Sequence, residues 1–306
     1  NREAAAGARR LTDSFPSPPR PPQKLRGCLR LFRSVVFLRM SPARPIAFDF
    51  GENWSDFSTH ALTTERVAQA RRDFATLLGE IPLTGRTFLD IGFGQGLSLL
   101  TAASLGGKVH GCDINPKCAQ VLARNLRHFP GVTAVPPVTV GSILDEAVLA
   151  ELHQASGGRG FDIVHSWGVL HHTGDMDRAL RHAAKLVAPG GHLVLALYNR
   201  HWSSGAWRAI KWSYVHSPRW LQRALIGLFY PVIYVAKWLV TRTNPKKQER
   251  GMDFYYDVVD WVGGYPYEYA SRDEVEAQLA RREFTLVRFL PARVPTGCNE
   301  FIFQRT

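Results

Sequence analysis

Cysteine is scarce in this chain, and its spacing shows no structural pattern. The 306 residues contain four cysteines, which form no CxxC pair and no regular framework: Cys28, Cys112, Cys118 and Cys298. This absence argues against a disulfide scaffold and favours reduced thiols in a cytoplasmic protein. We predict no metal site, and we find no internal repeat.

Acidic residues are scarce at the start of the chain, and this explains most of its net charge of +12. Residues 1–39 hold nine Lys/Arg against two Asp/Glu, whereas the other 267 residues hold 29 against 24. The segment lacks hydrophobic periodicity and contains SPPRPPQ, so we predict that 1–39 is disordered or a non-native extension before Met40. A transit peptide is the alternative, because the segment is Arg-rich. The charge is therefore weak evidence for nucleic-acid binding, and we expect no nucleic-acid partner.

The chain also lacks an uninterrupted apolar run of transmembrane length. Residues 225–240 are apolar, but the run has only sixteen residues and contains Pro231 and Lys237. Its tyrosines, tryptophan and basic flanks are typical of a segment at an anionic lipid surface. A buried cap helix or a homodimer interface is the alternative. We thus expect a cytoplasmic protein, with peripheral membrane contact if this run meets lipid.

What the chain does contain is a regular alternation of strand-like and helix-like segments. Such alternation predicts parallel strands joined by crossover helices. We expect an α/β fold with a doubly wound, mostly parallel seven-stranded sheet, a C-terminal antiparallel hairpin and an α-rich insertion. The predicted parts are an N-terminal arm and helix that act as a lid (40–84), a cofactor-binding core (85–199), a cap (200–270) and the end of the core (271–306).

The predicted cap interrupts this alternation. Residues 200–270 carry six tryptophans but no strand–helix repeat, and the repeat resumes at Ser271 and Glu274, which form a capping-box pair. An insertion at this point of an open α/β sheet lies near the carboxyl ends of the strands, where ligands bind. We therefore expect 200–270 to cover a substrate.

The strongest local signal is a glycine-rich turn between a strand and a helix, LDIGFGQG. Gly92, Gly94 and Gly96 allow a close approach of the backbone to a ligand, and the helix amino terminus attracts a carboxylate. Asp113 ends the next strand, where an acid binds ribose hydroxyls. The spacing is GxGxG rather than the dinucleotide pattern GxGxxG. Asp90, two residues before the first glycine, would meet a ligand ammonium or else bond the loop amides.

Three runs of the sequence carry a family resemblance. TFLDIGFGQG with Asp113, FDIVHSWGVLHHTGD, and LVAPGGHLVLALYN resemble the strand motifs of class I S-adenosylmethionine-dependent methyltransferases. The resemblance covers roughly residues 85–200 and 271–306. WGVLHHTG, DWVGGYPYE and GCNEF also resemble a bacterial group likened to quinone-precursor methylases. The resemblance implies S-adenosyl-L-methionine as cofactor.

The resemblance also implies roles for individual residues around that cofactor. The three glycines would line its methionine part, Asp113 would hold the ribose, and Ile114 would lie against the adenine. The family often has an acid after the third strand, where this chain has Ser142, which would take that role; Asp145, three residues on, would contribute there or only cap the next helix. Ser166 and Trp167 stand where base-modifying enzymes carry a Pro-Pro-aromatic motif, so methylation of a nucleobase amine is not indicated. Trp167 would wall the cofactor or fill the core.

Candidate catalytic residues follow the fourth strand. Transfer from a sulfonium is an in-line displacement, and a phenolic acceptor gains from a general base. His171 and His172 would supply that base, because histidine titrates in the useful range; the alternative is that they pack the pocket. Residues that would contact the substrate, or else serve as packing or turn residues, are Trp54, Tyr198, Asn199, Tyr255 and Trp261.

These observations favour a methyltransferase acting on a small molecule, transferring to the oxygen of a hydroxylated, lipid-soluble aromatic acceptor. A nucleic-acid methyltransferase and a non-catalytic cofactor-binding protein remain as alternatives, and a dinucleotide oxidoreductase is a fourth.

Overall fold

The computed structural model describes residues 47–246 and 253–306. The predictions made for 1–39 lie outside the described residues. The predicted lid is described from residue 47, and the predicted cap apart from 247–252.

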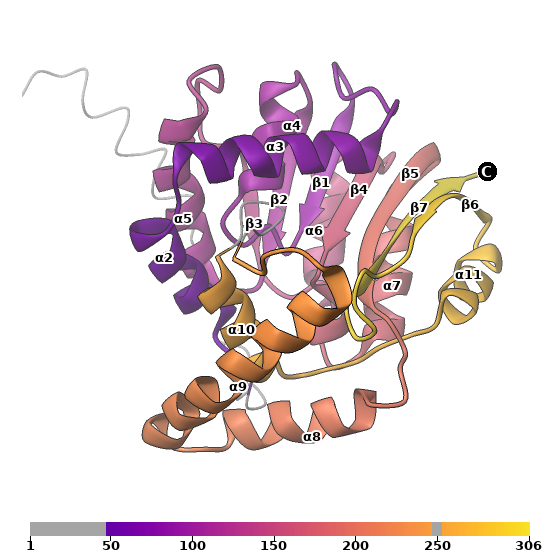
Figure 1. The fold of residues 1–306 in the computed structure, drawn as a ribbon. Helices are drawn as coiled ribbons and strands as arrows, with labels where there is room; N and C mark the ends of the chain where they lie inside the picture. Colours follow the sequence, from indigo (N-terminus) through magenta and orange to yellow (C-terminus); the bar gives the residue numbers. More distant parts are fainter. Residues whose placement is uncertain (1–46, 247–252) are drawn as a thin grey trace, which may run out of the picture. The chain divides into compact units, whose positions relative to one another are not determined.

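A seven-stranded sheet forms the centre of the molecule (Figure 1). Its order is β3-β2-β1-β4-β5-β7-β6, with β1 to β5 parallel and β7 antiparallel to both of its neighbours. This confirms the predicted fold class, including the C-terminal hairpin. The strands are β1 (Thr87–Ile91), β2 (Lys108–Asp113), β3 (Val138–Val140), β4 (Phe161–Trp167), β5 (Val187–Tyr198), β6 (Phe284–Leu290) and β7 (Cys298–Arg305).

Helices cover both faces of the sheet. One face packs against α3 (Thr64–Leu78), α4 (Leu97–Ser104) and α5 (Pro116–Asn125), the other against α6 (Glu146–Ala155), α7 (Met176–Lys185) and α11 (Arg272–Ala280). Neighbouring residues of a strand point to opposite faces, so Phe88 enters the first core and Leu89 the second. Two 3-10 turns, η2 (Leu126–His128) and η3 (Leu170–His172), follow α5 and β4.

Local signals in the sequence set several helix ends. Thr63 caps α3, and Gly79 ends it with a positive φ of 61°. Pro116 opens α5 in its first turn, and the capping box of Ser271 and Glu274 opens α11. Asp145 caps α6 by accepting the amide of Ala147, as the second of its two predicted roles required.

Helix α2 (Phe50–His60) formed no recognisable pattern in the sequence. Asp49 caps it, but its buried residues, Gly51, Phe57 and Ser58, do not repeat as a single apolar stripe. Tertiary contacts hold it instead. Side chains of α2 reach α5 and the cap, which lie on different sides of it: Asn53 bonds Asp260, and Ser58 bonds Asn125.

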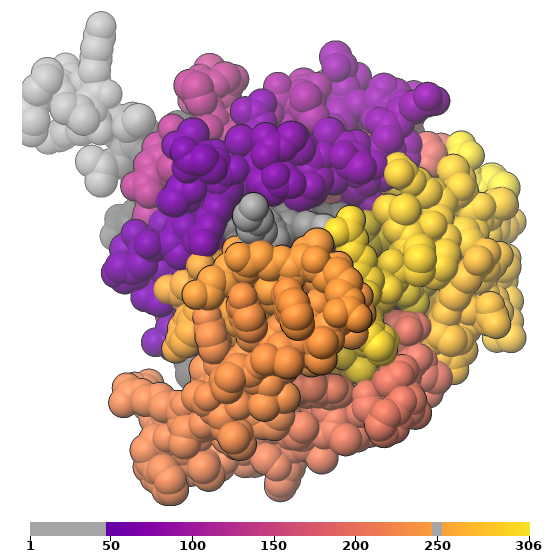
Figure 2. All heavy atoms as spheres, in the orientation of Figure 1, coloured from indigo at the N-terminus to yellow at the C-terminus, as the bar shows by residue number. Residues whose placement is uncertain are grey.

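The insertion folds as three helices, α8 (Ser204–Val215), α9 (Arg219–Thr241) and α10 (Phe254–Gly263). They enclose a third hydrophobic cluster at the end of the sheet where β5 finishes (Figure 1). Helix α9 contributes Ile226 and Ile233 to this cluster, but Leu228 and Val232 on its other side are 62% and 55% exposed. The expectation of a buried cap helix is therefore wrong for the outer face of α9, which lies on the molecular surface (Figure 2).

Candidate functional site

The glycine turn joins β1 to α4 and is held in a conformation that side chains disfavour. Gly92, Gly94 and Gly96 have φ values of 72°, 52° and 80°. A Cβ on Gly92 would lie 2.4 Å from Val169, and one on Gly96 would lie 2.3 Å from Leu122. The glycines are therefore required both by the backbone conformation and by the space around it.

Asp113 is joined directly to this turn. Its Oδ2 accepts the amide of Gly94 at 2.9 Å, and its Oδ1 accepts the amide of Asn115 at 2.8 Å. Burial raises the pKa of the Asp113 carboxyl, while these amides and the thiol of Cys118 oppose the shift. Each carboxylate oxygen keeps a further lone pair, so the group can still accept hydrogen bonds from a ligand.

The indole of Trp54 covers the turn. A Cβ on Gly94 would lie 2.9 Å from Trp54 Nε1, so the ring lies directly against the backbone at that glycine. The neighbouring residue Asn53 donates a 2.7 Å hydrogen bond to the Asp260 carboxylate of α10. Helix α2 thus contacts both the glycine turn and the cap, and its role as a lid stays a prediction.

Asp90 and Ser166 lie within the sheet. Asp90 Oδ1 is 2.7 Å from Nδ1 of His165 on the neighbouring strand, and both side chains are almost fully buried. The Ser166 hydroxyl donates to the carbonyl of Ile91 at 3.1 Å. Both side chains therefore tie β1 to β4 beneath the turn, and the role of Asp90 toward a ligand ammonium stays a prediction.

Three further cofactor candidates occupy the rim of the same edge. Ile114 is 45% exposed beyond Asp113, and Ser142 accepts the amide of Leu144. Trp167 donates its indole N–H to Glu300 at 2.7 Å and packs on the α3–α4 side of the sheet. Trp167 is thus a partly buried side chain that packs against the core, and its contact with a cofactor stays a prediction.

The two candidate histidines are packed beside Tyr198. The rings of His171 and Tyr198 lie 4.1 Å apart, and His171 Nδ1 accepts the amide of Tyr198. His172 donates from Nδ1 to the carbonyl of Pro266 at 2.6 Å. Burial lowers the pKa of His171 well below its usual value and that of His172 to about 3. Both histidines are therefore neutral at physiological pH.

The structure adds Lys211, a residue to which the sequence analysis gave no role. Lys211 of α8 is 2% exposed, and its Nζ donates to the backbone carbonyl of Asp260 at 3.1 Å. Burial lowers the pKa of Lys211 to about 7 and raises that of Asp260 to about 8. A lysine within an apolar helix of the insertion, AWRAIKWSYV, was the available signal.

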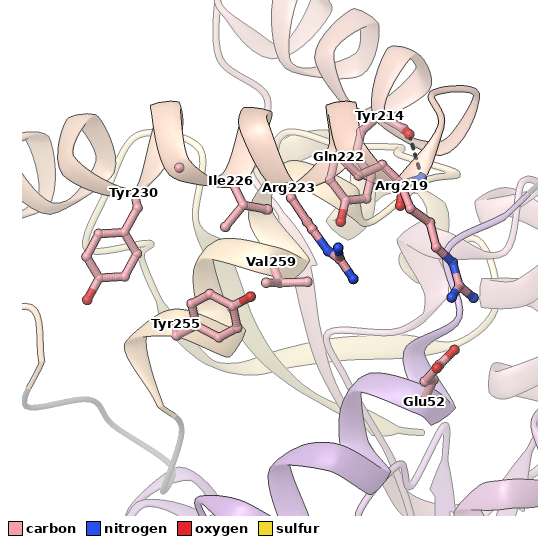
Figure 3. Close-up of a pocket in the computed structure, with 10 residues that line it drawn as sticks. Glu52, Tyr214, Arg219, Gln222, Arg223, Ile226, Tyr230, Tyr255 and Val259 are labelled. Atoms are coloured by element: carbon pink, nitrogen blue, oxygen red, sulfur yellow. Dashed lines mark hydrogen bonds between the residues drawn. The ribbon is translucent and has the colours of Figure 1, made fainter.

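The remaining substrate candidates lie in different parts of the structure. Asn199 is engaged with the loop before β7, because its amide donates to Pro295 and its carbonyl accepts from Asn299. Trp261 faces inward and lines a small cavity together with Lys211. Tyr255 instead lines a larger pocket of about 600 Å³ between α9, α10 and α2 (Figure 3). Trp261 therefore shares a cavity with Tyr198, and Tyr255 does not line that cavity.

Comparisons with known proteins agree with this geometry. The family profile described as a methyltransferase domain matches residues 63–287. A ubiquinone biosynthesis O-methyltransferase from Methylobacterium sp. (strain 4-46) is 30% identical over 167 residues, which is 55% of this chain and 62% of that protein. The chain thus matches less than two thirds of the length of this curated relative.

Solved structures show the same fold at low identity. Magnesium protoporphyrin IX methyltransferase from Synechocystis PCC 6803 with bound SAH has a TM-score of 0.50 and 14% identity, covering 83% of this chain and 94% of that one. A SAM-dependent methyltransferase from Anabaena variabilis ATCC 29413 has a TM-score of 0.51 and 11% identity, covering 89% and 100%.

The chain belongs to the class I S-adenosylmethionine-dependent methyltransferases. S-adenosyl-L-methionine is the cofactor of this family, and the glycine turn fits it. Helix α4 begins at Gly96 without a side-chain cap, which leaves its amino terminus for a carboxylate. The buried Gln95 Oε1 has no hydrogen-bond partner in the described structure, and a ligand ammonium would satisfy such an acceptor.

Proposed function

We propose that this protein transfers the methyl group of S-adenosyl-L-methionine to a hydroxyl oxygen of a small aromatic acceptor. The proposal rests on the observation that helix α2 contacts both the glycine turn and the buried polar group of the cap. Trp54 of α2 covers the glycine turn, while Asn53 contacts Asp260 in a buried group of titratable and aromatic side chains. The similarity to ubiquinone biosynthesis O-methyltransferases supports oxygen as the acceptor atom.

The bound cofactor supplies an activated methyl group, so the protein has to position the reactants and exclude water. The amides at the start of α4 would hold the cofactor carboxylate, and Asp113 would hold the ribose. Trp54 would close over the turn. On the acceptor side, Tyr198 and Tyr267 have ring centroids 5.0 Å apart and provide aromatic surfaces for a planar acceptor.

A lipid-soluble acceptor agrees with the surface of α9. Among the described residues, α9 is the helix long and apolar enough to cross a membrane, yet only 11% of its apolar window is buried. Its inner side packs on α10, where Lys237 pairs with Asp257 at 3.1 Å. Since one side is committed to the cap, we propose that the exposed side rests on the lipid interface of the cytoplasmic membrane.

Basic residues stand at both ends of α9 and fit an anionic lipid surface. Arg219 and Arg223, near its amino end, line the pocket between α9 and α10 (Figure 3). Arg242 ends the helix. The pocket would let an acceptor pass from lipid toward the cap. A second copy of this chain on the same apolar side is the alternative partner.

Incubation with methyl-labelled S-adenosylmethionine tests the proposal. Bacterial extracts separated into lipid, water-soluble metabolite and nucleic-acid fractions would serve as acceptors, and we expect label in the lipid or metabolite fraction. Alkali-stable label on an aryl ether would identify oxygen as the acceptor atom. Label confined to nucleic acid would overturn the substrate class, whereas cofactor binding in calorimetry without transfer would favour a non-catalytic binding protein.

A further inference from the structure

Lys211 is buried in an unusual setting for a lysine. Its side chain lies between the ring of Tyr198, 5.5 Å from Nζ, and the ring of Tyr267, 5.0 Å from Nζ. Within the described residues, no carboxylate oxygen lies within 4.0 Å of Nζ. Nζ donates a hydrogen bond to the backbone carbonyl of Asp260. A buried amine with this environment is held partly in its neutral form.

The amine adjoins a cavity rather than solid core. The cavity measures about 10 Å³, which is room for about one water molecule. Its walls come from β5, α8, α10 and the segments before α11 and β7: Tyr198, Trp207, Lys211, Trp261, Tyr267 and Thr296. An acceptor would enter only if the cap moved away from the end of β5, because the closed form leaves room beside the amine for about one water molecule and no more.

This cavity lies close to the glycine turn. Val169, just before η3, lies against Gly92, and His171 within η3 has its ring 4.1 Å from that of Tyr198, which is a wall of the cavity. A second connection runs through α2, whose adjacent residues Asn53 and Trp54 contact Asp260 and Gly94. A methyl donor on the turn and a hydroxyl beside Lys211 are therefore placed on the same edge of the sheet.

The histidines are less suited than Lys211 to remove a proton from a hydroxyl. A general base works best when its pKa lies near the operating pH. Burial lowers the pKa of His172 to about 3, and its Nδ1 is already bonded to Pro266. Burial brings the pKa of Lys211 to about 7, far closer to that of a phenol.

We propose that the Lys211 amine is the catalytic base of this enzyme, accepting the proton of a phenol-class hydroxyl as its oxygen is methylated. The proposal rests on the proposed function. The O–H bond breaks, its proton binds the lone pair of Nζ, and the oxygen pair forms the C–O bond. The C–S bond breaks at the same time, and its electrons remain on sulfur as a neutral thioether. The ammonium of Lys211 then releases its proton to solvent when the cap opens.

Several charged and titratable groups share this environment and would shape the pH profile of the reaction. Asp257 and Asp260 of α10 favour the protonated lysine, as does Cys298 of β7. The other groups facing the same space are His171, His172, Tyr198 and Tyr267.

Two variants and two acceptors test the proposal in the full-length protein. Lys211→Met fills the same space without an amine, and Lys211→Arg keeps a cation that does not deprotonate. The probes are catechol, whose hydroxyl is protonated at neutral pH, and 4-nitrocatechol, whose nitro group ionises a hydroxyl near neutrality. Calorimetry with S-adenosylmethionine and a thermal melt check the cofactor site and the fold of each variant.

We expect wild type to methylate both probes, with kcat rising through an apparent pKa near 7 on catechol. Both variants should lose about 10²-fold or more in kcat on catechol, the usual contribution of general-base catalysis. On 4-nitrocatechol the loss should shrink to within about tenfold, because no proton has to be removed.

Equal losses on both probes would overturn the assignment of Lys211 as the base, as would an unchanged rate on catechol. If a Met or Arg variant fails to fold, Lys211→Gln takes its place in the same comparison of the two probes. The wild-type pH profile on catechol and 4-nitrocatechol then gives a second test of the same assignment. Cofactor binding by wild type with no transfer to either probe would instead overturn the proposed hydroxyl acceptor.

Discussion

Asp113 links the end of β2 to the glycine turn, so its removal affects both ligand and loop. We predict that Asp113→Ala weakens binding of S-adenosylmethionine by about 1–3 kcal/mol, the loss expected when hydrogen bonds to a charged group disappear. Titration calorimetry measures the change. Asp113→Asn is the matched control, because it keeps the shape and one acceptor for Gly94, and its loss should be smaller. Unchanged affinity in Asp113→Ala would show that the ribose assignment is wrong.

The lowered pKa of the buried His172 makes the free energy of unfolding depend on pH. Its folded pKa of about 3 lies below the ordinary value of about 6.5, so between these values the unfolded chain binds a proton that the folded protein does not. The free energy of unfolding therefore falls as pH drops from 6.5 toward 3. We predict that the free energy of unfolding falls by about 1–2 kcal/mol less in His172→Gln than in wild type between pH 7 and pH 5, as measured by urea unfolding. The magnitude follows because one pH unit corresponds to about 1.4 kcal/mol for a single proton. Parallel curves for the two proteins would contradict the burial of a neutral ring.

Single residues of the site differ in how well the sequence reveals them. The three glycines and Asp113 follow a strand–turn–helix order, so the local pattern is enough to predict that they form one site. His165, Lys211 and Asn53 obtain their partners only through tertiary contacts with Asp90 and Asp260. No spacing in the chain predicts a pair such as Asn53 and Asp260.

Among the secondary-structure elements, α9 allows a direct test of lipid binding. Leu228 and Val232 lie one turn apart on its exposed side, so aspartates there would place charge in an apolar interface. We predict that wild type cosediments with phosphatidylglycerol vesicles and far less with phosphatidylcholine, and that Leu228→Asp with Val232→Asp abolishes this binding. Val287→Asp on β6 is the matched control, because Val287 is 57% exposed and lies outside the cap.

The same variants separate lipid from a partner subunit. If the double substitution changes the mass found by sedimentation equilibrium while vesicle binding is absent from all proteins, the outer face of α9 is a homodimer interface. Loss of vesicle binding at constant mass supports the membrane.

Elements of the sheet were predictable because each combines a short apolar run with a cap, proline or glycine at its end. The sequence predicts a helix from about Thr64 to Leu78, which is the observed range of α3, and strands over TFLDIG, KVHGCDI and FDIVHSW, close to β1, β2 and β4. It predicts the fifth strand only over HLVLALYN, whereas β5 begins at Val187 and continues through Gly190 and Gly191. Helix α2 was missed, since residues on several of its sides are buried by α5 and the cap rather than by a single core.

At the scale of the whole molecule, the excess of basic residues lies mainly in 1–39. We predict that residues 40–306 bind tRNA and duplex DNA weakly, with little change in affinity between about 50 and 200 mM salt, because few phosphates are neutralised. Fluorescence anisotropy of labelled nucleic acids measures this, with the full chain as the comparison. Micromolar binding by 40–306 with a steep salt dependence would restore the nucleic-acid alternative.

Helix α2 touches both the glycine turn and Asp260 of the cap. Asn53 and Trp54 are consecutive residues, so α2 is unable to withdraw from one compartment and keep its contacts in the other. We therefore predict ordered binding, with S-adenosylmethionine first and the acceptor second, and release of both products only after α2 moves away. Steady-state inhibition patterns with S-adenosylhomocysteine would reveal such a sequence.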